Sequence, residues 1–277
     1  MQVGELVGRG RTSDVFAYGS DSVVKIPHDD VPLDWPEFEA ALTDAVGSLG
    51  VPAPAVRDVM TVRGRSAVVF ERIVGLSMWE RMTANPEDAP ALARELVSIQ
   101  KALLATGIPP RIPELVGRME RKIQLAPGLT ATEQREAIAL TEQLPRGAAL
   151  LHGDLHPGNV LMGRSGPVVI DWFDATIGHP VADILRTSIL LQPGAAAEPQ
   201  HLPGASAELL LRVHGTYLRE FHSELAMVSP DLAAWQAVVA AARMCEGAEV
   251  NEDALISLWA ARHDVDRAAS ELVRTGD

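Results

Sequence analysis

The segment LLHGDLHPGNVLMGRSGPVVIDWFDA, residues 150–175, places two histidines, three aspartates and one asparagine among apolar residues typical of short strands. Four residues separate Asp154 from Asn159 in the loop HGDLHPGN, and Asp171 follows twelve residues later at the end of PVVID. Carboxylate and amide oxygens are the ligands that Mg²⁺ prefers in proteins. Metal-assisted phosphoryl transfer needs such ligands together with a carboxylate that aligns the acceptor hydroxyl. The segment therefore predicts phosphoryl-transfer chemistry.

A second group of residues near the N-terminus could hold a nucleotide. The stretch GRGRTSDV has Gly8 and Gly10, but Ser13 stands where a fuller glycine-rich pattern would have a third glycine. By itself this loop could equally be an ordinary hairpin turn. Lys25 follows fifteen residues after Gly10 within the apolar strand SVVKIP, where an unpaired ammonium group would be costly. A phosphate and an acidic partner would remove that cost, so the pattern favours a nucleotide site.

The order of elements predicts a strand-rich lobe over residues 1–74 and a helical lobe over residues 75–277. In the first lobe we expect a glycine-turned hairpin, a helix within residues 33–50, and strands at 56–62 and 66–70. In the second we expect helices within 87–107 and 130–144, and a proline-stiffened connection at 108–116. Short strands should flank the loop at 152–159, and a helix from 180 to 191 should precede a loop and two or three final helices.

Composition limits the classes of function. The chain of 277 residues has 24 basic and 37 acidic side chains, a net charge of −13. This charge argues against a general nucleic-acid binder, which needs a basic surface. It would favour a cationic ligand through the long-range field, although solubility alone also explains it. Cys245 is the single cysteine, and neither a signal-peptide core nor an apolar run of membrane-spanning length is evident, so we expect a cytoplasmic protein without a membrane segment.

The motifs HGDLHPGNVL and VVIDWFDATIGHPVADI resemble those of the aminoglycoside phosphotransferase and choline-kinase-like group of the protein-kinase-like fold. The resemblance extends from the glycine-containing hairpin to residues 150–175, which we call the catalytic segment, and the last ninety or so residues match only in being helical. It implies an α+β fold with two lobes, and ATP and Mg²⁺ as cofactors. Asp154 would be the catalytic carboxylate that orients the acceptor hydroxyl and accepts its proton, while Asn159 and Asp171 would bind Mg²⁺.

The resemblance also assigns the nucleotide-binding residues. Lys25 would contact the α- and β-phosphates and form an ion pair with a glutamate on the next helix. Glu39 is our choice for that glutamate because it lies eleven residues before Gly50, and Glu37 is the rival on another helical face. The backbone N–H groups at Gly8, Gly10 and Ser13 would approach the phosphates. The hinge, from Glu71 to Ile73, would pair with adenine.

Other polar residues of the catalytic segment have structural explanations. His152 and His156 are expected to brace the loop by hydrogen bonding, since Mg²⁺ does not favour imidazole. Asp174 is expected in a turn, with assistance at the metal or substrate as the alternative. The resemblance implies that Asp183 supports the catalytic loop from behind.

The residues that bind the acceptor are harder to find. Acidic side chains near the end of a late helix could receive an amino group, although a solvated helix face explains them as well: Glu246, Glu249, Glu252 and Asp253. Trp235 and Trp259 could stack on a sugar or a quaternary amine, but their helical spacing is more typical of core residues. We therefore predict a small-molecule kinase whose first-choice acceptor is an aminoglycoside-like or amino-sugar compound, with a role in antibiotic resistance.

Several alternatives stay open at this point. The acceptor could be metabolic, such as a sugar, homoserine or choline. Protein-kinase activity is disfavoured because no activation loop closing in Ala-Pro-Glu follows Asp171. A catalytically silent nucleotide-binding protein would keep the site without turnover. A two-metal phosphohydrolase could use the same carboxylates and would not need Lys25.

Overall fold

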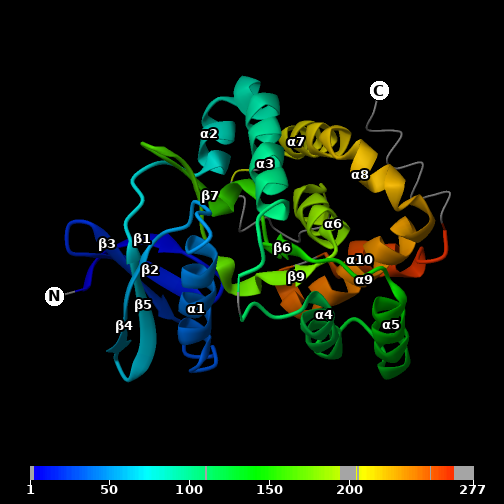
Figure 1. Ribbon diagram of the computed structural model, residues 1–277, viewed down its shortest axis with the longest axis horizontal. Helices are drawn as coiled ribbons and strands as arrows, with labels where there is room; N and C mark the ends of the chain where they lie inside the picture. The colour runs from blue at the N-terminus through cyan, green and yellow to red at the C-terminus, as the bar shows by residue number, and fades with distance from the viewer. Residues whose placement is uncertain (1–2, 110, 194–203, 205, 250, 265–277) are drawn as a thin grey trace.

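The computed structural model describes residues 3–109, 111–193, 204, 206–249 and 251–264. Figure 1 shows an antiparallel sheet with one helix at the end of the molecule that holds the N-terminus, and a larger, mainly helical region at the other end. The two regions meet around residues 72–77, which follow the last strand of the sheet. The arrangement matches the expected strand-rich and helical parts.

The N-terminal sheet has five antiparallel strands in the order β1-β2-β3-β5-β4. In β3, Val24 is fully buried with Ala67 and Val69 on one face of the sheet. The neighbouring Lys25 lies opposite Val68 in the register and therefore faces the other side, which carries the helix. The strands are β1 (Val3–Arg9), β2 (Ser13–Tyr18), β3 (Ser22–Pro27), β4 (Val56–Val62) and β5 (Arg65–Glu71).

Helix α1 (Trp35–Gly47) covers that second face and also reaches the helical region. It packs on β4 and β5, and Glu39 and Ala40 lie on its buried face. At its first turn, the rings of Trp35 and Phe38 lie 4.4 and 5.6 Å from the ring of Phe173, which belongs to the other region. These aromatic contacts hold the start of α1 against the catalytic segment.

The helical region surrounds a large apolar core. Helices α6 (Pro180–Leu191) and α9 (Leu232–Arg243) are buried along almost their whole length, and they pack against each other. Around them lie α2 (Met78–Ala84), α3 (Ala89–Leu104), α4 (Leu115–Gln124), α5 (Ala131–Gln143), α7 (Ala207–Glu220), α8 (His222–Met227) and α10 (Glu252–Ala260). None of the described helices is long and apolar enough to cross a bilayer.

Two small antiparallel pairs of strands carry the loops of the catalytic segment. Strand β6 (Ala149–Leu151) pairs with β9 (Thr176–Gly178), and β7 (Val160–Gly163) pairs with β8 (Gly166–Val169). The β6–β9 pair is almost fully buried, whereas the β7–β8 pair is partly buried. The β6–β9 pair joins the two ends of the segment that holds Asp154, Asn159 and Asp171, and the β7–β8 hairpin connects Asn159 to Asp171.

Two expectations about the helices were incomplete. Helix α4 was not predicted, because its start lies inside the stretch that we took for a proline-stiffened connection. After residue 206 the described residues form four α-helices rather than two or three. Only Phe221 separates α7 from α8, so no glycine or proline marks the break. Most of the expected loop at 192–206, including AAAE, lies outside the described residues.

Candidate active site

Lys25 joins the two regions of the molecule through two carboxylates. Its Nζ lies 2.6 Å from Oε1 of Glu39 on α1 and 3.2 Å from Oδ1 of Asp171 in the catalytic segment. Burial lowers the pKa of Lys25, but the charges of Asp171 and Glu39 outweigh it and hold the pKa above its ordinary value. Lys25 therefore stays charged at the junction of the sheet and the helical region.

The ion pair on α1 involves Glu39 and not its rival. Glu37 lies two residues earlier, where its Oε1 accepts a hydrogen bond from Ser66 Oγ at 3.2 Å. Because residues two apart on a helix point in different directions, one glutamate reaches Lys25 and the other reaches the edge of β5. Glu39 is 7% exposed, so Lys25 is the charge that compensates its burial.

The glycine hairpin closes as a tight turn. The backbone N–H of Gly10 donates to Ser13 O at 2.8 Å, and Gly8 lies opposite Val15 in the register of β1 and β2. Ser13 is 5% exposed. The hairpin thus uses the N–H of Gly10 for its own turn in this conformation.

The hinge is hydrogen-bonded to the sheet at its first two residues. The N–H of Glu71 donates to Ala55 O at 2.8 Å, and the N–H of Arg72 donates to Asp21 O at 2.9 Å. For Ile73, no backbone hydrogen bond to another described residue is formed. The backbone of Ile73 is therefore not engaged by another described residue.

The loop after β6 is held from behind and requires glycine. Gly153 has φ +79°, and a Cβ at this position would lie 2.3 Å from the carbonyl oxygen of Asp174. Asp183 Oδ1 accepts a hydrogen bond from the N–H of Gly153 at 2.7 Å, and its Oδ2 accepts one from Gln100 at 2.8 Å. Asp183 thus takes the supporting position that the family resemblance implied. By binding the backbone of Gly153, it helps to orient the next residue, Asp154.

Asp154 is paired with an arginine that the sequence alone did not single out. Arg186 on α6 donates from Nη2 to Asp154 Oδ1 at 2.7 Å and from Nε to Gly153 O at 3.2 Å. Burial raises the pKa of Asp154, but the guanidinium of Arg186 and neighbouring positive charges hold it well below the ordinary value. Asp154 is therefore ionised, oriented by Arg186, and a weak proton acceptor before a substrate is bound.

The two histidines brace this loop. His152 is fully buried, and its Nε2 lies 3.1 Å from Ile170 O while its Nδ1 accepts from the N–H of Asp154 at 3.2 Å. These partners require the tautomer with the proton on Nε2, and they leave neither nitrogen for acid–base work. His156 Nδ1 accepts from the N–H of Gly158 at 3.0 Å. Both contacts agree with the expected bracing role.

Asn159 and Asp171 offer oxygen atoms that fit a hard cation. The amide Nδ2 of Asn159 donates to Asp154 O at 3.0 Å, which leaves its Oδ1 without a hydrogen bond to the described residues. Asp171 has φ +65° and a side chain that is 44% exposed. No group of three or more His, Cys, Asp or Glu side chains able to hold a metal occurs among the residues described. Two protein oxygens suffice for Mg²⁺ when phosphates and water complete the shell.

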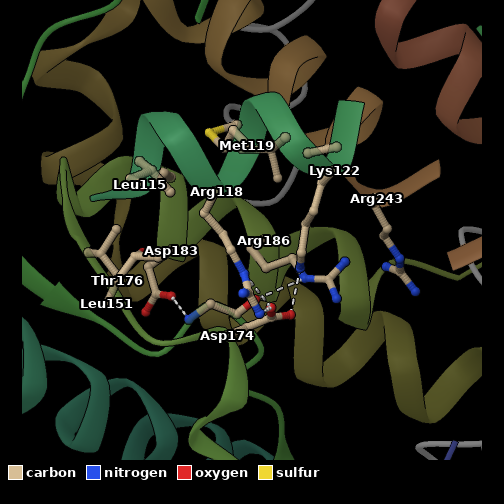
Figure 2. A pocket seen from close by; sticks show the side chains of 14 residues that line it. Leu115, Arg118, Met119, Lys122, Leu151, Asp174, Thr176, Asp183, Arg186 and Arg243 are labelled. Carbon is tan, nitrogen blue, oxygen red and sulfur yellow. Dashed lines mark hydrogen bonds and ion pairs between the residues drawn. The ribbon is translucent and has the colours of Figure 1, made fainter. Parts of the chain in front are cut away.

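Asp174 has a larger role than a turn residue. It accepts hydrogen bonds from Nε and Nη2 of Arg118 at 3.1 and 2.5 Å, and from Nζ of Lys122 at 2.5 Å. Although burial opposes it, the positive charges of Lys122 and Arg118 lower the pKa of Asp174 to about 2. Figure 2 shows both cations pointing from α4 toward Asp174, with the guanidinium groups of Arg186 and Arg243 on the same side of the helix.

The acidic and aromatic residues that we proposed for the acceptor do not form one binding surface. One is paired with cations, two are exposed at a helix start, and the tryptophans are buried. Glu246 lies 2.6 Å from Arg186 Nη2 and 3.4 Å from Arg243 Nε, so it already pairs with two cations. Glu252 and Asp253 are exposed at the start of α10, and the side chain of Glu249 is outside the described part. Trp235 and Trp259 are each 2% exposed and belong to the core, which is the explanation that their spacing favoured.

The basic residues at the site were missed by reasoning from the sequence. Arg118 and Lys122 lie on the unpredicted α4, Arg186 on α6 and Arg243 at the end of α9. A signal for α4 did exist: Leu115, Met119 and Ile123 recur every fourth residue. No comparable signal marks Arg186 or Arg243, because a single arginine in an apolar helix carries no motif.

Comparisons with known proteins show the family and the fold. A family model described as the phosphotransferase enzyme family matches residues 3–200. No curated protein matches the sequence. Among solved structures, amicoumacin kinase hAmiN in complex with AMP-PNP, Ca²⁺ and Ami has a TM-score of 0.61 at 16% identity, covering 94% of this chain and 87% of that one.

Two further structures are similar. An apo thermostable mutant of aminoglycoside phosphotransferase APH(4)-Ia has a TM-score of 0.59 at 16% identity, covering 99% and 95% of the two chains. A choline/ethanolamine kinase family protein from Mesorhizobium loti has a TM-score of 0.55 at 17% identity, covering 98% and 92%. At such identities these similarities establish the fold, and they confirm the expected α+β, protein-kinase-like arrangement. Because the family model spans well over half of the 277 residues, the chain belongs to the phosphotransferase enzyme family.

Proposed function

We propose that the protein is an ATP-dependent kinase that transfers the γ-phosphate to a hydroxyl group of a small molecule. The observation that carries this proposal is the bridge from Glu39 through Lys25 to Asp171, which joins the sheet to the catalytic segment. Residues 1–74 would form the nucleotide-binding lobe, and residues 75–277 would form the lobe that holds the catalytic loop and the acceptor.

The nucleotide would lie between the two lobes. Lys25 would weaken its ion pair with Asp171 and donate hydrogen bonds to the α- and β-phosphates. Its ion pair with Glu39 would hold the Lys25 side chain in place. The free backbone of Ile73, beyond the end of β5 at Glu71, would pair with adenine. The hairpin of Gly8, Gly10 and Ser13 would cover the phosphates, which requires some opening because the N–H of Gly10 now donates to Ser13 O.

Asn159 and Asp171 would hold Mg²⁺. When bound, the ion would neutralise charge on the β- and γ-phosphates. Asp171 has an exposed carboxylate for this purpose, and Asn159 is oriented by its bond to Asp154 O.

Asp154 would align the acceptor hydroxyl for in-line attack and accept its proton. Arg186 holds one oxygen, Oδ1, and a hydroxyl would donate to the carboxylate. Because Arg186 lowers the basicity of Asp154, positioning and stabilisation of charge would contribute more to the rate than proton abstraction from the free alcohol.

The acceptor is less defined than the reaction. The neighbours include a kinase of amicoumacin and phosphotransferases of aminoglycosides, and an aminoglycoside-like or amino-sugar acceptor was our first expectation. That expectation, with its role in resistance, stays a prediction. The acidic side chains that would receive amino groups do not gather beside Asp154 as free carboxylates, since Glu246 is already paired.

Binding and turnover of Mg·ATP test the reaction. We expect wild-type protein to bind Mg·ATP and to release ADP slowly to water, and Asp154→Ala to keep binding but lose ADP release. A silent nucleotide-binding protein would show equal, background release in both. A two-metal phosphohydrolase would keep its activity in Lys25→Ala, which the kinase would lose.

A further inference from the structure

We propose that the acceptor carries an anionic group, a carboxylate or a phosphate ester, which binds against Arg243 in the pocket between α4, α6 and α9. This inference rests on the proposed kinase function and names the class of its acceptor. It differs from the cationic acceptor that the net charge of the chain favoured.

The pocket lies beside the catalytic loop and is small. Its walls include Gly153 of that loop and Asp174, and among the described residues four cationic side chains line it: Arg118, Lys122, Arg186 and Arg243. The cavity measures about 50 Å³. A water needs roughly 10–15 Å³ on this measure, so the cavity has room for a few waters or one small ionic group.

Arg243 is the cation whose hydrogen-bond donors are least used. It is 2% exposed, and within the described part of the chain its Nε and Nη1 have no hydrogen-bond partner. Its nearest carboxylate oxygen, Glu246 Oε2, lies 3.4 Å from Nε without the geometry of a hydrogen bond. A buried guanidinium with unused donors is costly, so this group is poised to bind a further acceptor of hydrogen bonds.

The carboxylates nearby are shared. Asp174 serves both Arg118 and Lys122, and Glu246 serves both Arg186 and Arg243. Burial and the charge of Arg186 lower the pKa of Arg243 to about 10. An anion at Arg243 would reduce this repulsion, whereas an ammonium group would face Arg243 with Arg186 and Lys122 beside it.

The same contacts connect the anion site to the chemistry. Arg186 contacts Asp154 through Oδ1 and also contacts Glu246, which is the neighbour of Arg243. An anionic group on Arg243 would therefore anchor the acceptor three ion pairs away from the carboxylate that aligns its hydroxyl. Because the anionic group would bind Arg243, it would position the acceptor hydroxyl and leave the carboxylate of Asp154 available to that hydroxyl.

Ligands that share a carbon frame but differ in charge test the proposal directly. Calorimetric titrations of the protein saturated with Mg·AMP-PNP would compare glucose, glucosamine, gluconate and glucose 6-phosphate, and then glycerol, glycerate and glycerol 3-phosphate. We expect at least one anionic member of a frame to bind about 10- to 100-fold more tightly than its neutral counterpart, as hydrogen bonds to charged groups do. The carboxylate and phosphate arms show which anion the site takes.

Variants locate the effect. Arg243→Gln should remove the preference for the anion, Arg243→Lys should keep part of it, and Arg212→Gln, an exposed arginine of α7, should leave it unchanged. Because Arg243 is buried, Lys122→Gln serves as a second variant and should weaken anion binding several-fold. Melting temperatures with and without AMP-PNP verify that each variant is folded.

Either of two results would overturn the proposal. The first is that no anionic ligand binds more tightly than its neutral or cationic counterpart in either frame. The second is an anion preference that persists in folded Arg243→Gln. Failure of the kinase function would look different, because the wild-type protein would then not bind Mg·AMP-PNP or would not release ADP from ATP.

Discussion

The proposed nucleotide side and the proposed acceptor side of the site differ in how their residues are assembled. On the nucleotide side, Lys25 meets one carboxylate from α1 and one from the catalytic segment, and each belongs to a short motif or an expected helix. On the acceptor side, the cations come from α4, α6 and α9. The chemistry of phosphoryl transfer demands a fixed set of groups at fixed spacing, whereas recognition of the acceptor uses single residues spread along the chain.

The largest effect should come from Asp154, the proposed catalytic carboxylate, which lies between the two proposed sides. Asp154→Asn should lower ADP release by about 10²- to 10⁴-fold, the range typical of general acid–base groups. The dissociation constant of Mg·ATP, measured by calorimetry, should change less than threefold, because Asp154 contacts Arg186 and the loop rather than Lys25. If Asp154→Asn released ADP at the wild-type rate, Asp154 would not be the catalytic carboxylate.

The second prediction concerns the loop that carries Asp154. Gly153→Ala should lower the free energy of unfolding by more than 2 kcal/mol, because it adds a clash at 2.3 Å with Asp174 O to the strain of a left-handed residue. Gly50→Ala is the matched control, since Gly50 has φ +78° and open space around it. It should cost about 1 kcal/mol. Urea unfolding measures both free energies. If Gly153→Ala and Gly50→Ala lost the same free energy of unfolding, the close contact between position 153 and Asp174 O would not contribute to stability.

The third prediction uses the low pKa of Asp174 on the acceptor side. A carboxyl whose pKa falls from 3.8 to about 2 on folding stabilises the folded protein above about pH 4, and this stabilisation is lost as the pH falls through about 2. Asp174→Asn should therefore be less stable by about 2 kcal/mol at pH 7. The difference between wild type and variant should shrink toward pH 2. A difference independent of pH would contradict the role of its charge.

The smallest effect is expected on the nucleotide side. Glu39→Gln should raise KM for ATP about tenfold, since Lys25 would keep Asp171 but lose its closest partner. Glu37→Gln should change KM less than twofold, because that side chain contacts Ser66. Steady-state ADP release at varied ATP measures both. Equal effects of the two changes would mean that the Lys25 pair does not set nucleotide affinity.

Much of the fold could be predicted because it depends on local periodicity. The helix containing Glu39, the strands of the sheet and the loop HGDLHPGN follow from apolar spacing and from glycine or proline at the ends. Helix α4 was missed because its first residues adjoin three prolines, although Leu115, Met119 and Ile123 mark one face. The number of final helices was underestimated because α7 and α8 follow each other without a breaker.

The sequence by itself determined the family and the fold class, and it predicted the reaction class and the residues that would handle phosphate and metal, because this chemistry restricts both residue type and spacing. Only the tertiary structure decided that Arg186 holds Asp154, that Glu246 is already paired, and that Arg243 is buried with unused donors. Charge summed over the chain favoured a cationic ligand, yet in the pocket beside Asp154 three arginines and a lysine outnumber the two aspartates, among apolar side chains. The reason is physical: at close range in a buried pocket, the few groups that packing brings together outweigh the screened field of the whole surface.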